Sequence, residues 1–156
     1  MIPRIGQGFD IHPFSSQADR PLVLGGIVLE GPGLLGHSDA DVVAHAVADA
    51  LLGAAGLGDI GTRFSDTDPD LAGADSMKLL ANVVEAVSQE YEIGNVDITV
   101  ITEAPRISPH REAMQERLSA VVGAPVSVKA KRAESLGAIG RREGVACLAV
   151  ALILPR

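Results

Sequence analysis

The 156-residue chain contains no tryptophan, and aromatic residues make up only 3% of it. Its core must therefore be built from valine, leucine, isoleucine and alanine, and such an interior often gains further burial by oligomerisation. The chain has one cysteine, Cys147, so it cannot form an internal disulfide. Because Cys147 lies in the apolar run 145–154, we expect a buried, inert thiol rather than a nucleophile.

Positive charge is also scarce, because 13 lysines and arginines face 20 aspartates and glutamates and leave a net charge of −7. This balance argues against a nucleic-acid partner, since phosphate backbones require basic patches. A phosphorylated small molecule remains a possible ligand if a metal and local Arg or Lys side chains supply the positive charge. No apolar run approaches the length of a bilayer span, and residues 1–4 show no targeting pattern. We expect a soluble, cytoplasmic protein without a membrane partner.

The composition is that of a globular protein, with 47% hydrophobic and 21% charged residues, and the length fits one domain over residues 1–156. Asp39 or Asp41 can open a helix that ends near Gly56, and Ser38 or Asp39 is a natural N-cap for it. Strands alternate with helices, which predicts an α/β (α+β) fold with a single β-sheet and helices packed on one face. The expected strands are 2–12, one or two short ones within 21–29, 96–102, 126–131 and 145–154, and the expected helices are 39–56, 75–91 and 109–123.

Two imidazoles and one carboxylate form the most informative pattern in the chain. Asp10 and His12 flank Ile11 in an expected strand, so their side chains point to the same side of it. His45, from the following helix, could complete a three-ligand set. Nitrogen and oxygen ligands of this kind suit a zinc ion with one position left open, which is the catalytic arrangement. The competing interpretation is a set of ordinary surface or hydrogen-bonded residues.

A metal-bound histidine usually donates its second ring N–H to a carboxylate or a carbonyl. Asp41, His45 and Asp49 are spaced four residues apart and would share one helix face. Asp41 or Asp49 could therefore hold His45, although a plain solvated polar face is an alternative for Asp49. The segment 57–74, rich in Gly, Asp and Pro, is expected to be a loop, and a loop of this length is often functional.

Short sequence motifs indicate a family resemblance, and they follow one another in order over nearly the whole chain. They include Gly8-Phe9-Asp10-Ile11-His12, Gly36-His37-Ser38-Asp39-Ala40-Asp41, Gly58-Asp59-Ile60-Gly61 and Asp66-Thr67-Asp68-Pro69. Later motifs are Gly94-Asn95-Val96-Asp97, Ala104-Pro105-Arg106, Pro109-His110 and Gly140-Arg141-Arg142-Glu143-Gly144. In these motifs the chain resembles the 2-C-methyl-D-erythritol 2,4-cyclodiphosphate synthases of the non-mevalonate isoprenoid pathway.

The resemblance implies a homotrimer with active sites between neighbouring subunits. It implies Zn²⁺ (or Mn²⁺) on Asp10, His12 and His45, and Mg²⁺ held by the substrate diphosphate with help from Glu134. The substrate would be 4-diphosphocytidyl-2-C-methyl-D-erythritol 2-phosphate, whose 2-phosphate attacks the β-phosphorus and releases CMP. Phosphoryl transfer depends mainly on positioning and charge neutralisation, so two metal ions would suit this reaction.

The resemblance also assigns roles to individual residues, with His37 and Arg132 as the catalytic pair that stabilises the transition state. His37 and Ser38 precede a helix, which is a favourable place to hold a phosphate. The methylerythritol pocket would be lined by Asp59, Ile60, Gly61, Phe64, Ser65, Asp66, Thr67 and Asp68. The cytidine phosphate end would be held, from the adjacent subunit, by Thr102, Glu103, Ala104, Pro105, Arg106, Ile107, Ser108, Ala130, Lys131, Arg132, Ala133 and Glu134. Further substrate contacts would come from Asp10, Ile11, His12, Ala138 and Arg141.

The chain departs from the family pattern at a few positions. Arg132 stands where a threonine hydroxyl is expected on the diphosphate, and its guanidinium could supply a charge-assisted contact instead. Ala138 stands where an aromatic residue is common beside the trimer axis. For Arg141 and Glu143 we favour a structural ion pair on one strand face over a ligand contact.

Two other functions are consistent with the same residues. A metal-dependent phosphohydrolase would use a metal-bound water as nucleophile and release inorganic phosphate. A non-catalytic nucleotide-binding or scaffold trimer would explain Arg132 at an expected catalytic position. The identity of the product separates the cyclase from the hydrolase, and the turnover of an Arg132→Thr variant separates the cyclase from the scaffold.

Overall fold

The structure is a computed structural model and describes residues 2–156. The strands are β1 (Arg4–Pro13), β2 (Leu22–Leu24), β3 (Ile27–Leu29), β4 (Tyr91–Ile101), β5 (Val126–Lys131) and β6 (Gly144–Pro155). The α-helices are α1 (Val42–Ala55), α2 (Ile60–Arg63), α3 (Ser76–Val87), α4 (Arg111–Val122) and α5 (Gly137–Gly140), and short 3₁₀ helices span Pro69–Leu71 and Ser108–His110.

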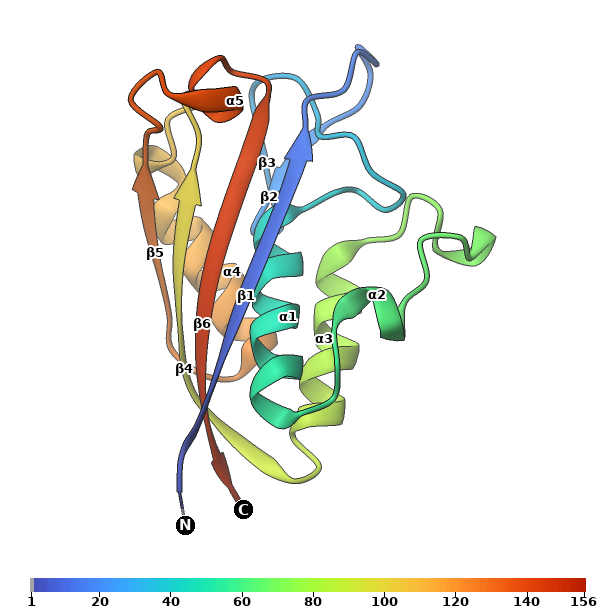
Figure 1. Cartoon of the computed structure of the whole chain (residues 1–156), viewed down its shortest axis with the longest axis vertical. Coiled ribbons are helices and arrows are strands. Elements are labelled where there is room, and N and C mark those ends of the chain that lie inside the picture. Colours follow the sequence, from blue (N-terminus) through green and yellow to red (C-terminus); the bar gives the residue numbers. More distant parts are fainter. Residues whose placement is uncertain (1) are drawn as a thin grey trace.

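One sheet in the order β1–β6–β4–β5 forms the main layer of the fold. Strand β6 pairs antiparallel with both β1 and β4, whereas β4 and β5 are parallel and are joined through α4. Helix α1 contacts β1 and β6, α4 contacts β5, and α3 lies beside α1, so these helices occupy one side of the sheet (Figure 1). The expected fold class, a sheet with helices packed on one face, is confirmed, although β2 and β3 form a separate two-stranded sheet.

Two glycines of β1 bring helix α1 unusually close to the sheet. Gly6 and Gly8 face the helix, and a Cβ atom built on Gly8 would lie 1.8 Å from the Ala46 carbonyl oxygen. A Cβ atom on Gly6 would lie 1.9 Å from the Ala50 carbonyl oxygen. Because side chains alternate along a strand, Asp10 and His12 share this face with the glycines. Strand β1 therefore carries two candidate ligands to the side on which α1 lies.

Aliphatic side chains fill the space between the sheet and the helices. Val96, Ile98 and Val100 of β4 are completely buried, as are Met114 and Leu118 of α4. Cys147 is also completely buried, and this burial raises the pKa of its thiol, so the expectation of an inert cysteine is confirmed. The core is thus made of the aliphatic residues that the composition predicts.

Helix α1 opens at Asp41, one of the two aspartates expected at its start. Asp41 is the N-cap, since its side chain accepts hydrogen bonds from the Val43 and Ala44 N–H groups, so the prediction of Ser38 or Asp39 as the N-cap is wrong. Asp41 also accepts from the N–H groups of Gly25 (2.8 Å) and Gly26 (2.7 Å), in the turn between β2 and β3. Both turn glycines have positive φ, as the tight hairpin requires. A single buried carboxylate therefore anchors the β2–β3 hairpin to the helix.

The expected segment ends are partly correct. Strand β5 has the predicted bounds, α1 ends at the predicted Gly56 and α4 at the predicted Gly123. Helix α3 starts at the predicted cap, Asp75, but it stops at Val87 because β4 starts at Tyr91, five residues earlier than expected. The early part of β4 continues the pairing with β6 through a bulge between Ile93 and Asn95.

Further differences concern short elements. The segment 57–74 is not entirely a loop, since it contains α2 and the first 3₁₀ helix. Helix α5 was not expected, and the first strand spans 4–13 rather than 2–12. Within residues 2–156, none of the helices combines the length and the apolar character that a membrane span needs.

Candidate functional site

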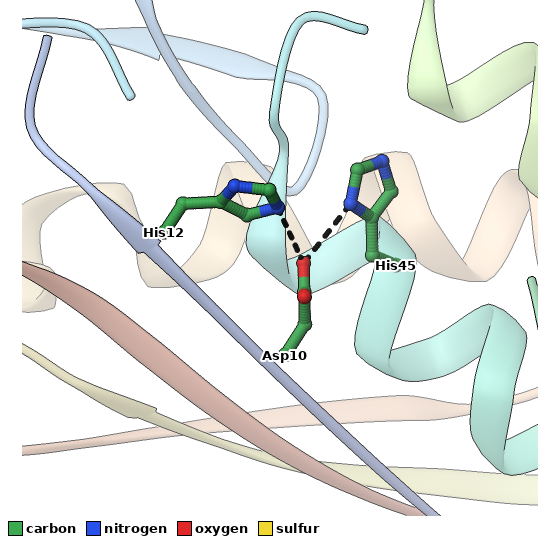
Figure 2. A group of neighbouring side chains, drawn as sticks. All are labelled: Asp10, His12 and His45. Atoms are coloured by element: carbon green, nitrogen blue, oxygen red, sulfur yellow. Dashed lines mark hydrogen bonds and ion pairs between the residues drawn. The ribbon is translucent and has the colours of Figure 1, made fainter. Parts of the chain in front are cut away.

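The three candidate ligands converge where the end of β1 meets the first turns of α1 (Figure 2). Asp10 Oδ2 lies 3.0 Å from His12 Nε2 and 3.0 Å from His45 Nδ1. One potential ligand atom from each residue lies within 4.8 Å of the other two. The structure therefore brings together the three side chains that the sequence pattern selected, two from the strand and one from the helix.

A backbone carbonyl fixes the proton on His12. The Nδ1 atom of His12 lies 2.8 Å from the Leu35 carbonyl oxygen. A carbonyl can only accept, so Nδ1 carries the hydrogen and the neutral ring presents the Nε2 lone pair to Asp10. Burial acts to lower the pKa of His12, but the hydrogen bond and charge of Asp10 outweigh it and raise this pKa above its ordinary 6.5.

Two serines, instead of the expected aspartates, contact the Nε2 atom of His45. Its Nε2 atom lies 2.8 Å from Ser76 Oγ and 3.2 Å from Ser38 Oγ. The prediction that Asp41 or Asp49 holds this ring is wrong. Asp41 is committed to the helix cap and the hairpin, and Asp49 accepts a 2.7 Å hydrogen bond from the Ile60 N–H. Ser76 is the first residue of α3, and no local spacing relates it to His45.

The cluster fits a divalent metal ion. If Ser76 accepts from His45 Nε2, the two neutral rings and the ionised Asp10 all point lone pairs at one another, and only a proton or a metal cation can satisfy such an arrangement. Burial acts to raise the pKa of Asp10, but the two histidines outweigh it and lower this pKa, which keeps the carboxylate ionised. Two ligands of a tetrahedral zinc ion lie about 3.4 Å apart. The observed 3.0 Å separations are close to that value.

A cavity of about 340 Å³ opens beside the cluster. Its lining includes the three candidate ligands, His37, Ser38 and part of the predicted methylerythritol pocket: Ile60, Gly61, Phe64, Ser65 and Asp66. Leu71 and Leu79 also line it and were missed, because a lone leucine in the expected loop 57–74 or the expected helix 75–91 carries no signal beyond core packing.

The other residues predicted for the methylerythritol pocket do not line this cavity, but they form hydrogen bonds next to it. Asp59 caps α2 by accepting from the Thr62 N–H, at 2.7 Å. Thr67 bonds to Ser65, with 2.7 Å between their hydroxyl oxygens. His37 Nε2 lies 2.7 Å from the Asp68 carbonyl oxygen, so His37 donates to the backbone of this loop. The loop 64–71 and the candidate catalytic histidine are therefore joined by a direct hydrogen bond.

A second and separate cavity, of about 420 Å³, contains the predicted cytidine phosphate residues. Its lining residues are Thr102, Glu103, Pro105, Arg106, Ile107, Ser108, Ala130, Lys131 and Arg132. Arg132 forms an ion pair with Glu103, with 2.9 Å between Nη2 and Oε2. The hydrogen bond from Arg132 lowers the pKa of Glu103 and outweighs the effect of desolvation. Within one chain, the structure does not bring Arg132 into the cavity that holds His37.

Several predicted site residues line neither cavity: Ile11, Ala104, Ala133, Glu134, Ala138 and Arg141. Ala133 contributes its N–H to Glu103, at 2.8 Å. The predicted Arg141–Glu143 ion pair is present at 2.9 Å. It does not lie on a strand, however, because Arg141 caps α5 and Glu143 precedes β6.

Comparison with known proteins places these features in context. A family model described as the YgbB family matches residues 3–154. The chain is 54% identical to a 2-C-methyl-D-erythritol 2,4-cyclodiphosphate synthase of Symbiobacterium thermophilum, and the match covers 97% of the chain and 99% of the relative. It is 51% identical to the enzyme of that name from Burkholderia thailandensis, with 97% and 95% covered. Among solved structures it resembles the IspF–CDP complex of Plasmodium falciparum, with a TM-score of 0.86, 36% identity, and 99% and 97% covered.

Proposed function

Since the chain belongs to the YgbB family, we propose that Asp10, His12 and His45, together with the two cavities, carry out the cyclisation for which its relatives are named. The protein is a lyase of the non-mevalonate isoprenoid pathway. It converts 4-diphosphocytidyl-2-C-methyl-D-erythritol 2-phosphate into 2-C-methyl-D-erythritol 2,4-cyclodiphosphate and releases CMP. The observation that carries the residue assignment is the convergence of the three ligands beside a cavity that His37 also lines.

In this reaction an oxygen of the 2-phosphate bonds to the β-phosphorus, and the bond from that phosphorus to the bridging oxygen breaks. The electron pair of the broken bond leaves with CMP. When bound, Zn²⁺ (or Mn²⁺) at the three ligands and Mg²⁺ on the diphosphate neutralise the charge of the phosphates. Such a transfer requires little covalent chemistry from the protein, so the side chains act mainly by positioning and electrostatics.

The residues around the cluster position the reacting groups. Asp10, His12 and His45 would hold a divalent metal that neutralises the diphosphate, and His37 stabilises charge on the transferring phosphoryl group. His37 must first exchange its hydrogen bond to the Asp68 carbonyl for one to the substrate. The cavity beside the cluster accepts the methylerythritol part through Ile60, Gly61 and Phe64. The small volume and mixed lining of this cavity suit a compact polyol.

The second cavity binds the cytidine phosphate end, and Glu134 would help to hold the Mg²⁺ ion. The solved complex of a relative with CDP supports a cytidine phosphate as the ligand class. Arg132 carries a permanent positive charge at the mouth of this cavity, where its guanidinium can exchange Glu103 for a phosphate oxygen. Because the two cavities are separate within one chain, a complete active site requires the second cavity of a neighbouring subunit.

The outer face of the sheet supplies the surface for such an assembly. Ile5, Phe9 and Ile11 of β1 point away from the helices and are 71%, 52% and 49% exposed. Val150 and Leu154 of β6 are exposed on the same sheet. An apolar sheet face of this extent is typical of a subunit interface. These exposed residues support a homotrimer in which the outer sheet faces meet at the centre.

A product assay tests the proposed function directly. The purified protein is incubated with the cytidylated substrate and Mg²⁺, with and without prior chelation, and ³¹P NMR identifies the products. We expect CMP and the cyclic diphosphate in equal amounts, and neither after chelation. Inorganic phosphate as the product would indicate a hydrolase, and intact substrate from a zinc-loaded trimer would contradict catalysis altogether.

Variants test the assignment of the residues. Asp10→Ala, His12→Ala and His45→Ala should each remove bound zinc and activity together, because each deletes one of only three protein ligands. Lys129→Ala is the control, since it removes an exposed ion pair with Asp97 that lies outside both cavities. Zinc retained at full occupancy in all three ligand variants would refute the proposed centre.

A further inference from the structure

The partly buried carboxylate of Asp39 contacts Ser76, the serine that holds His45. Ser76 Oγ donates its hydrogen to Asp39 Oδ1, and the Ser76 backbone N–H donates to Asp39 Oδ2 at 3.1 Å. Ser76 is 1% exposed and Asp39 is partly buried, so the serine side of these bonds is shielded from water. Hydrogen bonds therefore link the Asp39 carboxylate to the Ser76 hydroxyl, and the Ser76 hydroxyl to the ring of His45, a candidate metal ligand.

The number of hydrogen atoms available fixes which group donates in each of these hydrogen bonds. A serine hydroxyl has one hydrogen, and Ser76 gives it to a carboxylate that can only accept. Ser76 Oγ must therefore accept from His45 Nε2, so Nε2 carries the ring hydrogen and Nδ1 is free. Nδ1 is the atom that lies 3.0 Å from Asp10 Oδ2. The carboxylate thus selects, through the hydroxyl, which His45 nitrogen is available as a metal ligand.

We propose that Asp39 and Ser76 form a carboxylate–hydroxyl relay that positions His45 and strengthens it as a metal ligand. The relay rests on the metal centre proposed above, and it assigns Asp39 and Ser76 as positioning residues that touch neither metal nor substrate. A hydrogen bond that leads to a negative charge raises the basicity of the opposite ring nitrogen. Through the same contacts the relay ties the metal site to the packing of α3 against α1, which lie side by side in Figure 1.

Asp39 also has a structural role that any test must separate from the relay. Its carboxylate accepts from the Asp41 N–H at 3.0 Å, and it joins the loop before α1 to the first residue of α3. Loss of Asp39 could therefore weaken the fold without any effect on the metal. Zinc affinity measured on folded protein distinguishes the two roles, because a purely structural contact lowers stability and leaves the affinity of the folded state unchanged.

The experiment compares the zinc affinity of Asp39→Asn, Ser76→Ala and the double variant by competition with a chromophoric chelator. Each single variant should bind zinc about 10–100-fold more weakly than the unmodified protein, as other losses of a metal ligand's hydrogen-bond partner do. The double variant should be no weaker than Ser76→Ala alone, because Asp39 acts through the hydroxyl. Additive losses would mean that Asp39 acts independently of Ser76 and would overturn the relay.

Asp75→Asn is the matched control. It makes the same carboxylate-to-amide change at the same end of α3, where Asp75 accepts from the Met77 N–H at 2.9 Å, and it leaves His45 untouched. Its zinc affinity should stay within about threefold of the unmodified value, as for a charge change without a contact to the ligand. An equal loss in this control would assign the effect to general electrostatics and overturn the relay.

A measurement on the unmodified protein protects the test from variants that fail to fold. In zinc-loaded protein, ¹H–¹⁵N NMR of the ring should place the His45 hydrogen on Nε2, and a hydrogen on Nδ1 would overturn the relay. The outcomes also separate this inference from the proposed function. Absence of zinc binding by the unmodified protein refutes the metal centre, whereas Asp10-dependent zinc binding that is unchanged in Asp39→Asn and Ser76→Ala refutes only the relay.

Discussion

Replacement of Gly8 by alanine should disturb both the fold and the metal site, because this glycine sets the distance between β1 and α1. The added Cβ would lie 1.8 Å from the Ala46 carbonyl oxygen, whereas ordinary contact begins at 3.4 Å. Both groups belong to regular backbone and cannot rotate away. Helix α1 must therefore move from the sheet by about 1.6 Å, the difference between these two distances.

The consequences follow from what α1 carries. Ten of its residues are buried, so a displaced helix loses close packing along its length, and we expect a loss of about 3–5 kcal/mol in the free energy of unfolding. His45 moves with α1, while Asp10 and His12 stay on β1. Metal sites tolerate about 0.2 Å of error in ligand distance, so a displacement of about 1.6 Å should weaken zinc binding by more than about 100-fold.

The assay is urea unfolding of the chelated protein, followed by zinc titration of the folded variant. Gly53→Ala is the control, because Gly53 lies exposed within the same helix and its added Cβ would meet only the Gln7 carbonyl oxygen, at 3.9 Å. This change should stabilise the protein by about 0.5–1 kcal/mol, since alanine favours the helix. A Gly8→Ala protein with unchanged unfolding midpoint and zinc affinity would refute the reasoning.

Three further predictions concern other parts of the chain. Asp41→Ala should cost about 3–6 kcal/mol in chemical unfolding, because it removes a helix cap and leaves two hairpin N–H groups without acceptors, and a loss below about 1 kcal/mol would contradict this role. Phe9→Asp should convert the proposed trimer, of about 48 kDa or three times 16.1 kDa, to monomers in sedimentation, and persistence of the larger species would exclude this face as the interface. Asp10 raises the pKa of His12 in the folded protein, so the protonated ring adds stability that is complete below pH 6.5 and is lost as pH rises through this raised pKa. The difference in melting temperature between chelated protein and chelated His12→Ala should therefore shrink from pH 6 to pH 8. A difference that stays constant would show that the ring gains nothing from Asp10.

Local signals explain why much of the fold could be predicted. The helix ends at Gly56 and Gly123 are marked by glycines that adopt the left-handed conformation, with φ of 74° at both. Asp75 was predicted as a cap and accepts from the Met77 N–H. The common orientation of Asp10 and His12 follows from the two-residue period of a strand. Each of these features depends on a few neighbouring residues, so the sequence contains the whole signal.

Features that depend on distant partners could not be predicted in this way. The N-cap of α1 is Asp41 because the Gly25 and Gly26 N–H groups of the hairpin also point at it. Strand β4 starts at Tyr91, not at Val96, because the end of β6 extends beside it and provides hydrogen-bond partners. A helical pattern over 75–91 gives no indication of where a neighbouring strand ends.

The sequence by itself determined the chemical identity of the candidate ligands, the main sheet with helices on one face, and the motifs that indicate the cyclase family. Only the tertiary structure decided that His45 is held by Ser76, 31 residues away, and that His37 and Arg132 line different cavities. The physical reason is that ligand type and strand period are local properties. The partner of a side chain depends instead on how α3 packs against α1, and that packing is set by burial over the entire core.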